Sequence, residues 1–490
     1  MFEREKAENV ILGGGEPGKY MAWELARQGR QTVVIERALI GGSCPNIACL
    51  PSKNVIHSAE VAHLVRHAAE YGQRTGPVVT DMAGVRRRKR EMVDGLIDIN
   101  RKRFAADGLE FVLGEGRFLG PREIEIRLAA GGTRRIEADR VFLDLGTHAA
   151  VPDIPGLADA APLTHVEALE LARLPEHLVV LGGGYVGAEF AQAFHRLGSR
   201  VTVVEYGPQL LGREDADVAD AVTVMFQEEG IDVMLAAEAR SVEGRSGGRV
   251  RLHLRSAAGE RVLECSDVLV ATGRMPNTKD IGLDRAGVKL DSRGYIRVNE
   301  RLETSAPAVW AMGECAGSPQ FTHVAFDDFR VVRDNLAGVQ RTTRDRVIPY
   351  CVFIDPELGR VGLNETEAKQ NRIDARIVAL PMTSVLRARS LGETRGFMKV
   401  LLDAASDRIL GFTMLGPEAG EVIAVVQTAM LAGLPYTRLR DAIFTHPTMA
   451  EGLNVLLANV PARKRAEHDG RQARRRHARR ADAAPKAAAV

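Results

Sequence analysis

Long apolar runs and cysteines are scarce in this chain of 490 residues. No run of eighteen apolar residues occurs in it, which excludes a transmembrane helix. Five cysteines are too few for the disulfide framework of a small secreted domain. The first nine residues carry three Glu and two basic side chains before an apolar run of only three, which does not fit a secretory signal peptide. We therefore expect a cytoplasmic protein without a membrane partner.

Charge is distributed unevenly along a chain of otherwise ordinary composition. With 45% hydrophobic and 27% charged residues, the sequence is typical of a globular protein, and its length predicts roughly three domains. The formal net charge is +2, but residues 461–490 alone carry ten Lys or Arg and three acids. This tail has no Leu, Ile, Phe, Trp or Tyr, which predicts a disordered segment. Its cations favour a nonspecific contact with nucleic acid.

An internal repeat is the most informative feature of the sequence. NVILGGGEPG at 9–18 aligns with LVVLGGGYVG at 178–187, and an acid follows the first glycine of each copy by 23 residues, Glu36 in the first and Glu205 in the second. The glycines of the two fingerprints are Gly13, Gly15 and Gly18, and Gly182, Gly184 and Gly187. A strand, this glycine pattern, a helix and an acid at the end of the next strand are typical of dinucleotide binding, in which the acid accepts a hydrogen bond from a ribose 2′-hydroxyl and repels a 2′-phosphate. The repeat therefore predicts two bound dinucleotides.

Two cysteines lie close together shortly after the first copy of the repeat. Cys44 and Cys49 stand in IGGSCPNIACLPSK, where Pro45 suits the start of a helix. A zinc site would need a second pair of Cys or His at ligand spacing, and none is near, so we predict no metal site. The other three cysteines are isolated in the sequence, and we interpret them as small buried residues. We interpret Cys44 and Cys49 as a reversible disulfide.

The motif GGSCPNIACLPSK resembles the active site of the class I pyridine nucleotide-disulfide oxidoreductases, the flavoprotein family of dihydrolipoamide dehydrogenase, glutathione reductase and mercuric reductase. The resemblance extends from residue 9 to about residue 460 through VATGRMPN, VWAMGECAGSPQFTHVA and FTHPTMAEGL. It implies an α/β chain with two Rossmann-like dinucleotide-binding domains and a C-terminal α+β dimerisation domain. The implied boundaries are 1–150 and 274–346 for the FAD-binding domain, 151–273 for the NAD(P)-binding domain, 347–460 for the interface domain, and 461–490 for the tail.

The resemblance also implies roles for individual residues. Cys49 would lie next to the flavin, and Cys44 would exchange with substrate. Lys53 would pair with Glu189 near the flavin, and Tyr185 would cover the nicotinamide pocket. The remaining implied cofactor-binding positions are Gly42, Ser43, Gly146, Gly273, Gly313 and Glu314.

A histidine near the C-terminus completes the implied catalytic set. His446 resembles the acid/base histidine of the family, oriented by the carboxylate of Glu451, and the family supplies this motif from the partner subunit. A homodimer follows from that resemblance. The implied cofactors are FAD and a nicotinamide nucleotide. Glu205 favours NADH over NADPH, because no Lys or Arg stands between Glu205 and Arg213 to receive a 2′-phosphate.

Several positions depart from the family pattern. The usual Gly-Asp of the second flavin segment is Gly313-Glu314, and the usual Ala-Thr-Gly is replaced by LGT at 145–147, preceded by Asp144. No cysteine follows Cys351, although mercuric reductases use a C-terminal pair. We therefore expect electron transfer from NADH through FAD and the cysteine pair to a small disulfide or dithiol substrate. The alternatives are a soft metal-ion reductase of the mercuric or copper reductase branch, and a flavoprotein whose tail associates with nucleic acid.

Overall fold

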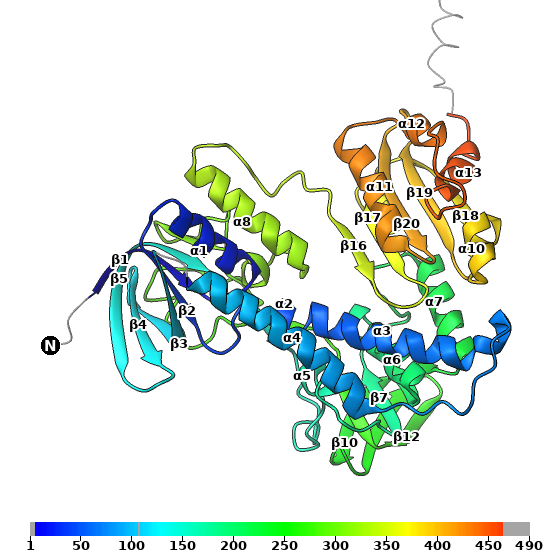
Figure 1. The fold of residues 1–490 in the computed structure, drawn as a ribbon, viewed down its shortest axis with the longest axis horizontal. Coiled ribbons are helices and arrows are strands. Elements are labelled where there is room, and N and C mark those ends of the chain that lie inside the picture. The colour runs from blue at the N-terminus through cyan, green and yellow to red at the C-terminus, as the bar shows by residue number, and fades with distance from the viewer. Residues whose placement is uncertain (1–4, 106–107, 464–490) are drawn as a thin grey trace, which may run out of the picture. The chain divides into compact units, whose positions relative to one another are not determined.

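The computed structural model describes residues 5–105 and 108–463. The chain divides into two compact units, the first ending at Leu358 and the second beginning at Gly359. Figure 1 shows the ribbon and labels many of the helices and strands. Within the described residues, no helix combines the length and the apolar character needed to cross a membrane. The predicted disordered tail lies outside these residues except for 461–463.

The first unit begins with a six-stranded sheet of mixed direction. β1 (Glu5–Leu12) pairs in parallel with both β2 (Thr32–Glu36) and β5 (Thr133–Leu143), and α1 (Glu16–Arg27) connects β1 to β2. The remaining strands of this sheet are β3 (Leu109–Gly120), β4 (Glu123–Leu128) and β15 (Val309–Ala311). All of β2 is buried, as expected of a parallel strand covered on both faces. The strand, glycine loop, helix and second strand of the first repeat are thus formed as predicted.

The second copy of the repeat builds a separate parallel sheet in the same unit. Its strands run in the order β13-β7-β8-β9, with bounds β7 (His177–Leu181), β8 (Arg200–Val204), β9 (Asp232–Met234) and β13 (Asp267–Val270). α6 (Tyr185–Leu197) connects β7 to β8, and α7 (Ala216–Glu229) connects β8 to β9. A smaller antiparallel sheet contains β10 (Glu238–Gly244), β11 (Val250–Ser256) and β12 (Gly259–Cys265). The predicted pair of Rossmann-like folds is therefore confirmed.

Two long helices join the two folds. α3 (Cys49–Arg66) packs against both α4 (Met82–Phe104) and α6, and Figure 1 shows α3 and α4 crossing the first unit together. Shorter elements complete this unit: α2 (Ser43–Asn46), η1 (Ala68–Tyr71), β6 (Thr147–Ala149), α5 (His165–Ala168), β14 (Arg274–Pro276), η2 (Gly313–Ala316), α8 (Thr322–Leu336) and β16 (Pro349–Val352). Because α3 begins at Cys49 and packs against the fingerprint helix of the second fold, it connects the cysteine pair to the second nucleotide loop.

The second unit is α+β, as predicted for the interface domain. Its strands follow the order β17-β20-β19-β18, with bounds β17 (Leu358–Gly362), β18 (Ala375–Pro381), β19 (Phe397–Asp403) and β20 (Ile409–Leu415). The helices are α9 (Glu365–Gln370), η3 (Met382–Ser384), α10 (Leu386–Leu391), α11 (Ala419–Leu431), α12 (Tyr436–Arg440) and α13 (Gly452–Ala458). α11 packs on β20, and α13 packs on β18 and β19. Every residue of β20 is buried, so this strand forms the centre of the unit's core.

Candidate active site

The two cysteines lie on neighbouring short segments that glycine and asparagine hold in place. Cys44 is in α2, and Cys49 is the first residue of α3. The Asn46 amide donates to the carbonyls of Ile40 at 2.9 Å and Gly42 at 2.7 Å, which closes the loop before α2. Gly42 has a φ of +79°, and a Cβ atom there would lie 2.4 Å from the Cα of Gly15. Only glycine allows this approach, so the cysteine loop packs directly on the first fingerprint loop.

Cys44 and Cys49 are both half-buried free thiols, so the structure represents the reduced form of the pair. A hydrogen bond from Cys44 lowers the pKa of Cys49 to about 6, and the Thr322 hydroxyl and the Lys53 ammonium act in the same direction against the effect of burial. The same hydrogen bond raises the pKa of Cys44. The Thr322 Oγ1 lies 3.2 Å from the Cys49 Sγ. Cys49 is therefore a thiolate at neutral pH, and Cys44 keeps its proton.

A buried carboxylate links the cysteine helix to the second nucleotide fold. The Lys53 Nζ, one turn after Cys49, donates to the two carboxylate oxygens of Glu189 at 2.8 and 3.0 Å. The backbone N–H of Phe353 donates to Glu189 at 2.9 Å, and Lys53 also lies 4.7 Å from the centroid of the Phe353 ring. The structure thus brings Glu189 next to Lys53 and Cys49, although Glu189 is 136 positions away from Lys53 in the sequence. Their catalytic roles stay predictions.

The first fingerprint loop has the form of a dinucleotide cradle. Gly13 has a φ of +99°, and a Cβ atom there would lie 1.9 Å from the Asp144 carbonyl oxygen. α1 starts after Gly15 without a side-chain cap from that residue. The Glu36 carboxylate accepts hydrogen bonds from three backbone N–H groups, those of Gly14 at 2.8 Å, Ala38 at 2.9 Å and Leu39 at 3.0 Å. A helix N-terminus and a fixed acceptor at the end of the neighbouring strand fit the adenosine diphosphate half of FAD.

The second fingerprint loop repeats this arrangement. Gly182 has a φ of +101°, and a Cβ atom there would lie 2.6 Å from the Ala271 carbonyl oxygen. The Glu205 carboxylate accepts hydrogen bonds from the backbone N–H groups of Gly183 and Gly207, each at 2.6 Å. A Cβ atom built on Gly184 would meet nothing within 4 Å, which leaves this side of the loop open to a ligand. The loop therefore fits a second nucleotide.

Among the other predicted cofactor-binding positions, Glu314 lies next to Thr147. Glu314 and the Thr147 hydroxyl form a hydrogen bond, and Arg274 donates to the same hydroxyl at 2.6 Å and lies 3.4 Å from Glu314. Gly146 accepts a backbone hydrogen bond from Asn277, and Gly273 accepts one from Ala150, on the two sides of the β6–β14 pair. The N–H of Gly313 donates to Asp328 at 2.7 Å. Arg274 stands in the quoted motif VATGRMPN, but the sequence analysis gave it no role.

Tyr185 lies at the first position of α6, between the second glycine loop and Glu189. Its hydroxyl donates to the Glu214 carboxylate at 2.6 Å, and the Tyr350 hydroxyl donates to the same oxygen at 2.6 Å. The two rings stack with centroids 5.5 Å apart, and Tyr350 stacks in turn on Phe321 at 5.2 Å. The sequence reasoning missed Glu214, Tyr350 and Thr322. Only Thr322 stood within a quoted motif, FTHVA.

His446 and Glu451 lie in the second unit, where they form the predicted pair. The His446 Nδ1 is 3.0 Å from each carboxylate oxygen of Glu451. The His446 side chain is 62% exposed. That these residues act in a partner subunit's site stays a prediction.

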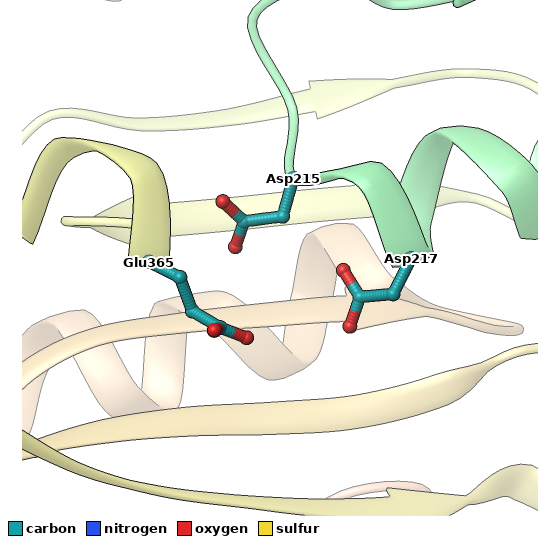
Figure 2. A group of neighbouring side chains, drawn as sticks. All are labelled: Asp215, Asp217 and Glu365. Carbon is teal, nitrogen blue, oxygen red and sulfur yellow. The ribbon is translucent and has the colours of Figure 1, made fainter. Parts of the chain in front are cut away.

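Acidic side chains also stand at two helix starts outside the cysteine site. Asp215 precedes α7 and Asp217 lies in its first turn, as Figure 2 shows, where carboxylates interact favourably with the helix dipole. Glu365, in the first turn of α9, forms an ion pair with Lys399 at 2.9 Å within the second unit. Each acid thus has a structural role in its own unit.

Comparisons with known proteins match most of the chain to one family. The profile described as "Pyridine nucleotide-disulphide oxidoreductase" matches residues 7–328, and the dimerisation domain of the same description matches residues 348–456. The chain is 36% identical over 461 residues to the probable pyridine nucleotide-disulfide oxidoreductase RclA of Escherichia coli, covering 93% of this chain and 99% of that protein.

Two further relatives bear other functional names. The chain is 34% identical to the mercuric reductase of Acidithiobacillus ferrooxidans, with 91% of this chain and 81% of that protein covered. It is also 34% identical to the dihydrolipoyl dehydrogenase of Thermus scotoductus, with 91% and 95% covered. Among solved structures, a Cu(II) complex of E. coli RclA, described as an HOCl-induced flavoprotein disulfide reductase, superposes with a TM-score of 0.84 at 35% identity, covering 93% of this chain and 99% of that one.

Proposed function

Because the chain belongs to the pyridine nucleotide-disulphide oxidoreductase family and is an FAD-dependent, NAD(P)H-using flavoprotein disulfide reductase, we propose that its Cys44–Cys49 pair reduces a small disulfide. The observation that carries this proposal is the environment of Cys49. A thiol at a helix N-terminus, hydrogen-bonded to Cys44 and Thr322 and near the Lys53 ammonium, has its pKa lowered to about 6. A low-pKa thiolate paired with a neighbouring thiol suits reversible thiol–disulfide exchange.

Several residues of this chain would hold the cofactor and the nucleotide. The Gly13–Gly18 loop and Glu36 would bind FAD, with Gly42 and Glu314 completing its surroundings. When bound, FAD supplies the relay of electron pairs between the nicotinamide nucleotide and the cysteine pair. Tyr185 and Glu189 lie on the helix that starts at the second glycine loop and would line the nicotinamide side.

The exchange with substrate follows from the protonation of the two thiols. Cys44 loses its proton to a base and attacks one sulfur of the substrate disulfide, which forms a mixed disulfide and releases the first thiol after protonation. The Cys49 thiolate then attacks the Cys44 sulfur, which restores the Cys44–Cys49 disulfide and releases the second thiol. One substrate disulfide gains two electrons from the two cysteines, which are oxidised. It gains one proton from Cys44 and one from solvent, because Cys49 starts as a thiolate. His446 of the partner subunit, oriented by Glu451, would be the base, since Cys44 is protonated at neutral pH.

We assign NADH as the preferred donor. The Glu205 carboxylate, held by two backbone N–H groups, offers an acceptor for a ribose 2′-hydroxyl and would repel a 2′-phosphate.

A steady-state screen with NADH tests this function. The acceptors are lipoamide, oxidised glutathione, other small disulfides, Cu(II) and Hg(II). We expect turnover with at least one disulfide in the wild type, and loss of that turnover in Cys44→Ser with NADH-dependent bleaching of the flavin retained. Absence of turnover with every disulfide would contradict the proposal.

A soft metal ion is the second candidate substrate. A thiolate and a neighbouring thiol suit ions such as Hg(II) or Cu(I), and the relatives include mercuric reductases and an RclA crystallised with Cu(II). The same screen distinguishes a metal-ion substrate from a disulfide substrate. NADH consumption with Cu(II) or Hg(II) but with no disulfide would favour the metal ion. Metal turnover that survives in Cys44→Ser and in Cys49→Ser would exclude the cysteine pair as its site.

The assembly and the location are also parts of the proposal. The dimerisation domain supports a homodimer. The cytoplasmic location and a nonspecific contact of the basic tail with nucleic acid stay predictions. Truncation after residue 463 tests the third candidate function, association of the tail with nucleic acid. If nucleic-acid binding disappears while NADH-dependent reduction is unchanged, the tail is an accessory to the enzyme.

A further inference from the structure

A carboxyl group lies directly beneath the first glycine loop. Asp144 follows β5, is buried, and its Oδ2 accepts a hydrogen bond from the backbone N–H of Gly18 at 2.9 Å. Cβ atoms built on Gly15 and Gly18 would lie 2.6 and 2.8 Å from this oxygen. On the other side, a Cβ atom on Gly313 would lie 3.6 Å from Oδ1. The side chain thus occupies the space between the fingerprint loop and the second flavin segment.

The surroundings of this carboxyl are unfavourable for a negative charge. Glu36 and Glu16 both raise the pKa of Asp144, and burial, the largest effect, raises it well above its usual range. The Gly18 N–H and the Lys19 ammonium lower it, but Lys19 is paired with Glu16 at 2.6 Å. On the other side, α8 contributes Asp328, which forms an ion pair with Arg346 at 2.7 Å, and η2 contributes the Cys315 thiol.

We propose that Asp144 is an FAD-positioning residue that caps α1 as a neutral carboxylic acid, and that its proton is needed for tight FAD binding. As a neutral acid, Asp144 can accept the Gly18 hydrogen bond without adding a negative charge to the loop that receives the FAD pyrophosphate. An ionised Asp144 would repel that pyrophosphate in a water-poor site. The inference rests on the proposed placement of FAD in this loop.

The sign of the expected pH dependence follows from linkage. Bound pyrophosphate raises the pKa of Asp144 further, so the bound state holds the proton more strongly than the apoprotein. FAD affinity is then highest below the pKa of the apoprotein. It falls by up to about tenfold per pH unit until the pKa of the bound state is reached.

The test compares wild type, Asp144→Asn and Asp139→Asn. Asn is isosteric and cannot ionise, and Asp139 is an exposed acid of the same strand, so its substitution controls for the loss of one charge. FAD release on heating, followed by flavin fluorescence, and titration of apoprotein with FAD are measured from pH 5.5 to 9.5. We expect the wild type and Asp139→Asn to lose FAD more easily as pH rises, and Asp144→Asn to retain FAD with less than about threefold change in affinity. The same pH dependence in Asp144→Asn and wild type would overturn the proposal.

Infrared spectroscopy of the wild-type holoprotein reports the proton directly. The C=O stretch of a protonated carboxyl should be present at pH 7, shift in D₂O and vanish in Asp144→Asn. Absence of the band at pH 7 overturns the proposal, even where Asp144→Asn fails to fold. Gly13→Ala tests the loop separately, because unchanged FAD binding in that variant would reject FAD from this loop and with it the proposed placement.

Discussion

At the scale of single residues, the hydroxyl of Thr322 is expected to set the reactivity of Cys49. Thr322→Val removes a hydrogen-bond donor to the thiolate but keeps the shape of the side chain, and hydrogen bonds to charged groups contribute about 1.5–3 kcal/mol. The pKa of Cys49 should therefore rise from about 6 by about one unit or more. The measurement is the rate of alkylation of the reduced enzyme against pH, with Cys49 identified by peptide mass spectrometry. Thr322→Ser is the matched control and should retain a midpoint near that of the wild type. Equal midpoints in all three proteins would remove Thr322 from the site.

Several of the site residues that the sequence predicted lie close together in the sequence, whereas those that it missed have partners far away in the sequence. Cys44, Cys49 and Lys53 stand within one short motif, so their neighbourhood is local and readable. Thr322 meets Cys49 across 273 positions of sequence, and no periodicity or spacing connects them. Glu214 is recognised only when two tyrosine hydroxyls, one 136 positions away, point at the same oxygen. Long-range hydrogen bonds of this kind depend on the packed fold and not on a local pattern.

At the scale of elements, the ion pair between α3 and α6 is expected to tune Cys49 in two opposite directions. The Lys53 ammonium lowers the pKa of Cys49, and the Glu189 carboxylate raises it. Lys53→Met should therefore shift the alkylation midpoint of Cys49 upward, and Glu189→Gln should shift it downward. Thiolate-dependent alkylation at pH 6 should be slower in the first variant and faster in the second. Shifts of the same sign would indicate a general disturbance of the site instead of an electrostatic effect.

The end of β8 is expected to select the nucleotide. Glu205→Ala removes the carboxylate that would repel a 2′-phosphate, so kcat/KM for NADPH should rise while kcat/KM for NADH falls. Initial rates with both nucleotides at several concentrations give the ratio. Glu36→Ala is the informative comparison, since the equivalent acid of the first fold should alter FAD retention and leave the NADH to NADPH ratio unchanged. A wild-type preference for NADPH would contradict the assignment of Glu205.

Local pattern predicted the elements around the two nucleotide loops well. In both copies, an apolar strand, a glycine turn and a helix were foreseeable because each is determined by neighbouring residues. The antiparallel sheet of β10, β11 and β12 was not foreseen. The short pair of β6 with β14 was not foreseen either, because it joins segments more than a hundred residues apart. α3 packs on α6, and both folds lie in the compact unit that ends at Leu358. The boundaries between the two dinucleotide-binding domains stay a prediction.

At the scale of the whole molecule, the proposed site needs a cysteine pair and a histidine from different subunits. Cys44→Ser and His446→Ala should each strongly reduce disulfide turnover as homodimers. Dissociating and reassembling an equal mixture of the two variants produces heterodimers in which one site combines an intact Cys44 with an intact His446 of the partner subunit. A random mixture should therefore recover about a quarter of the wild-type sites. If His446 instead acted on Cys44 of its own chain, neither subunit of the heterodimer would hold both groups, and the mixture would stay as inactive as its components. Flavin reduction by NADH, measured in the same mixture, should remain near the wild-type rate, because it requires neither Cys44 nor His446 and therefore confirms that the reassembled dimers are folded.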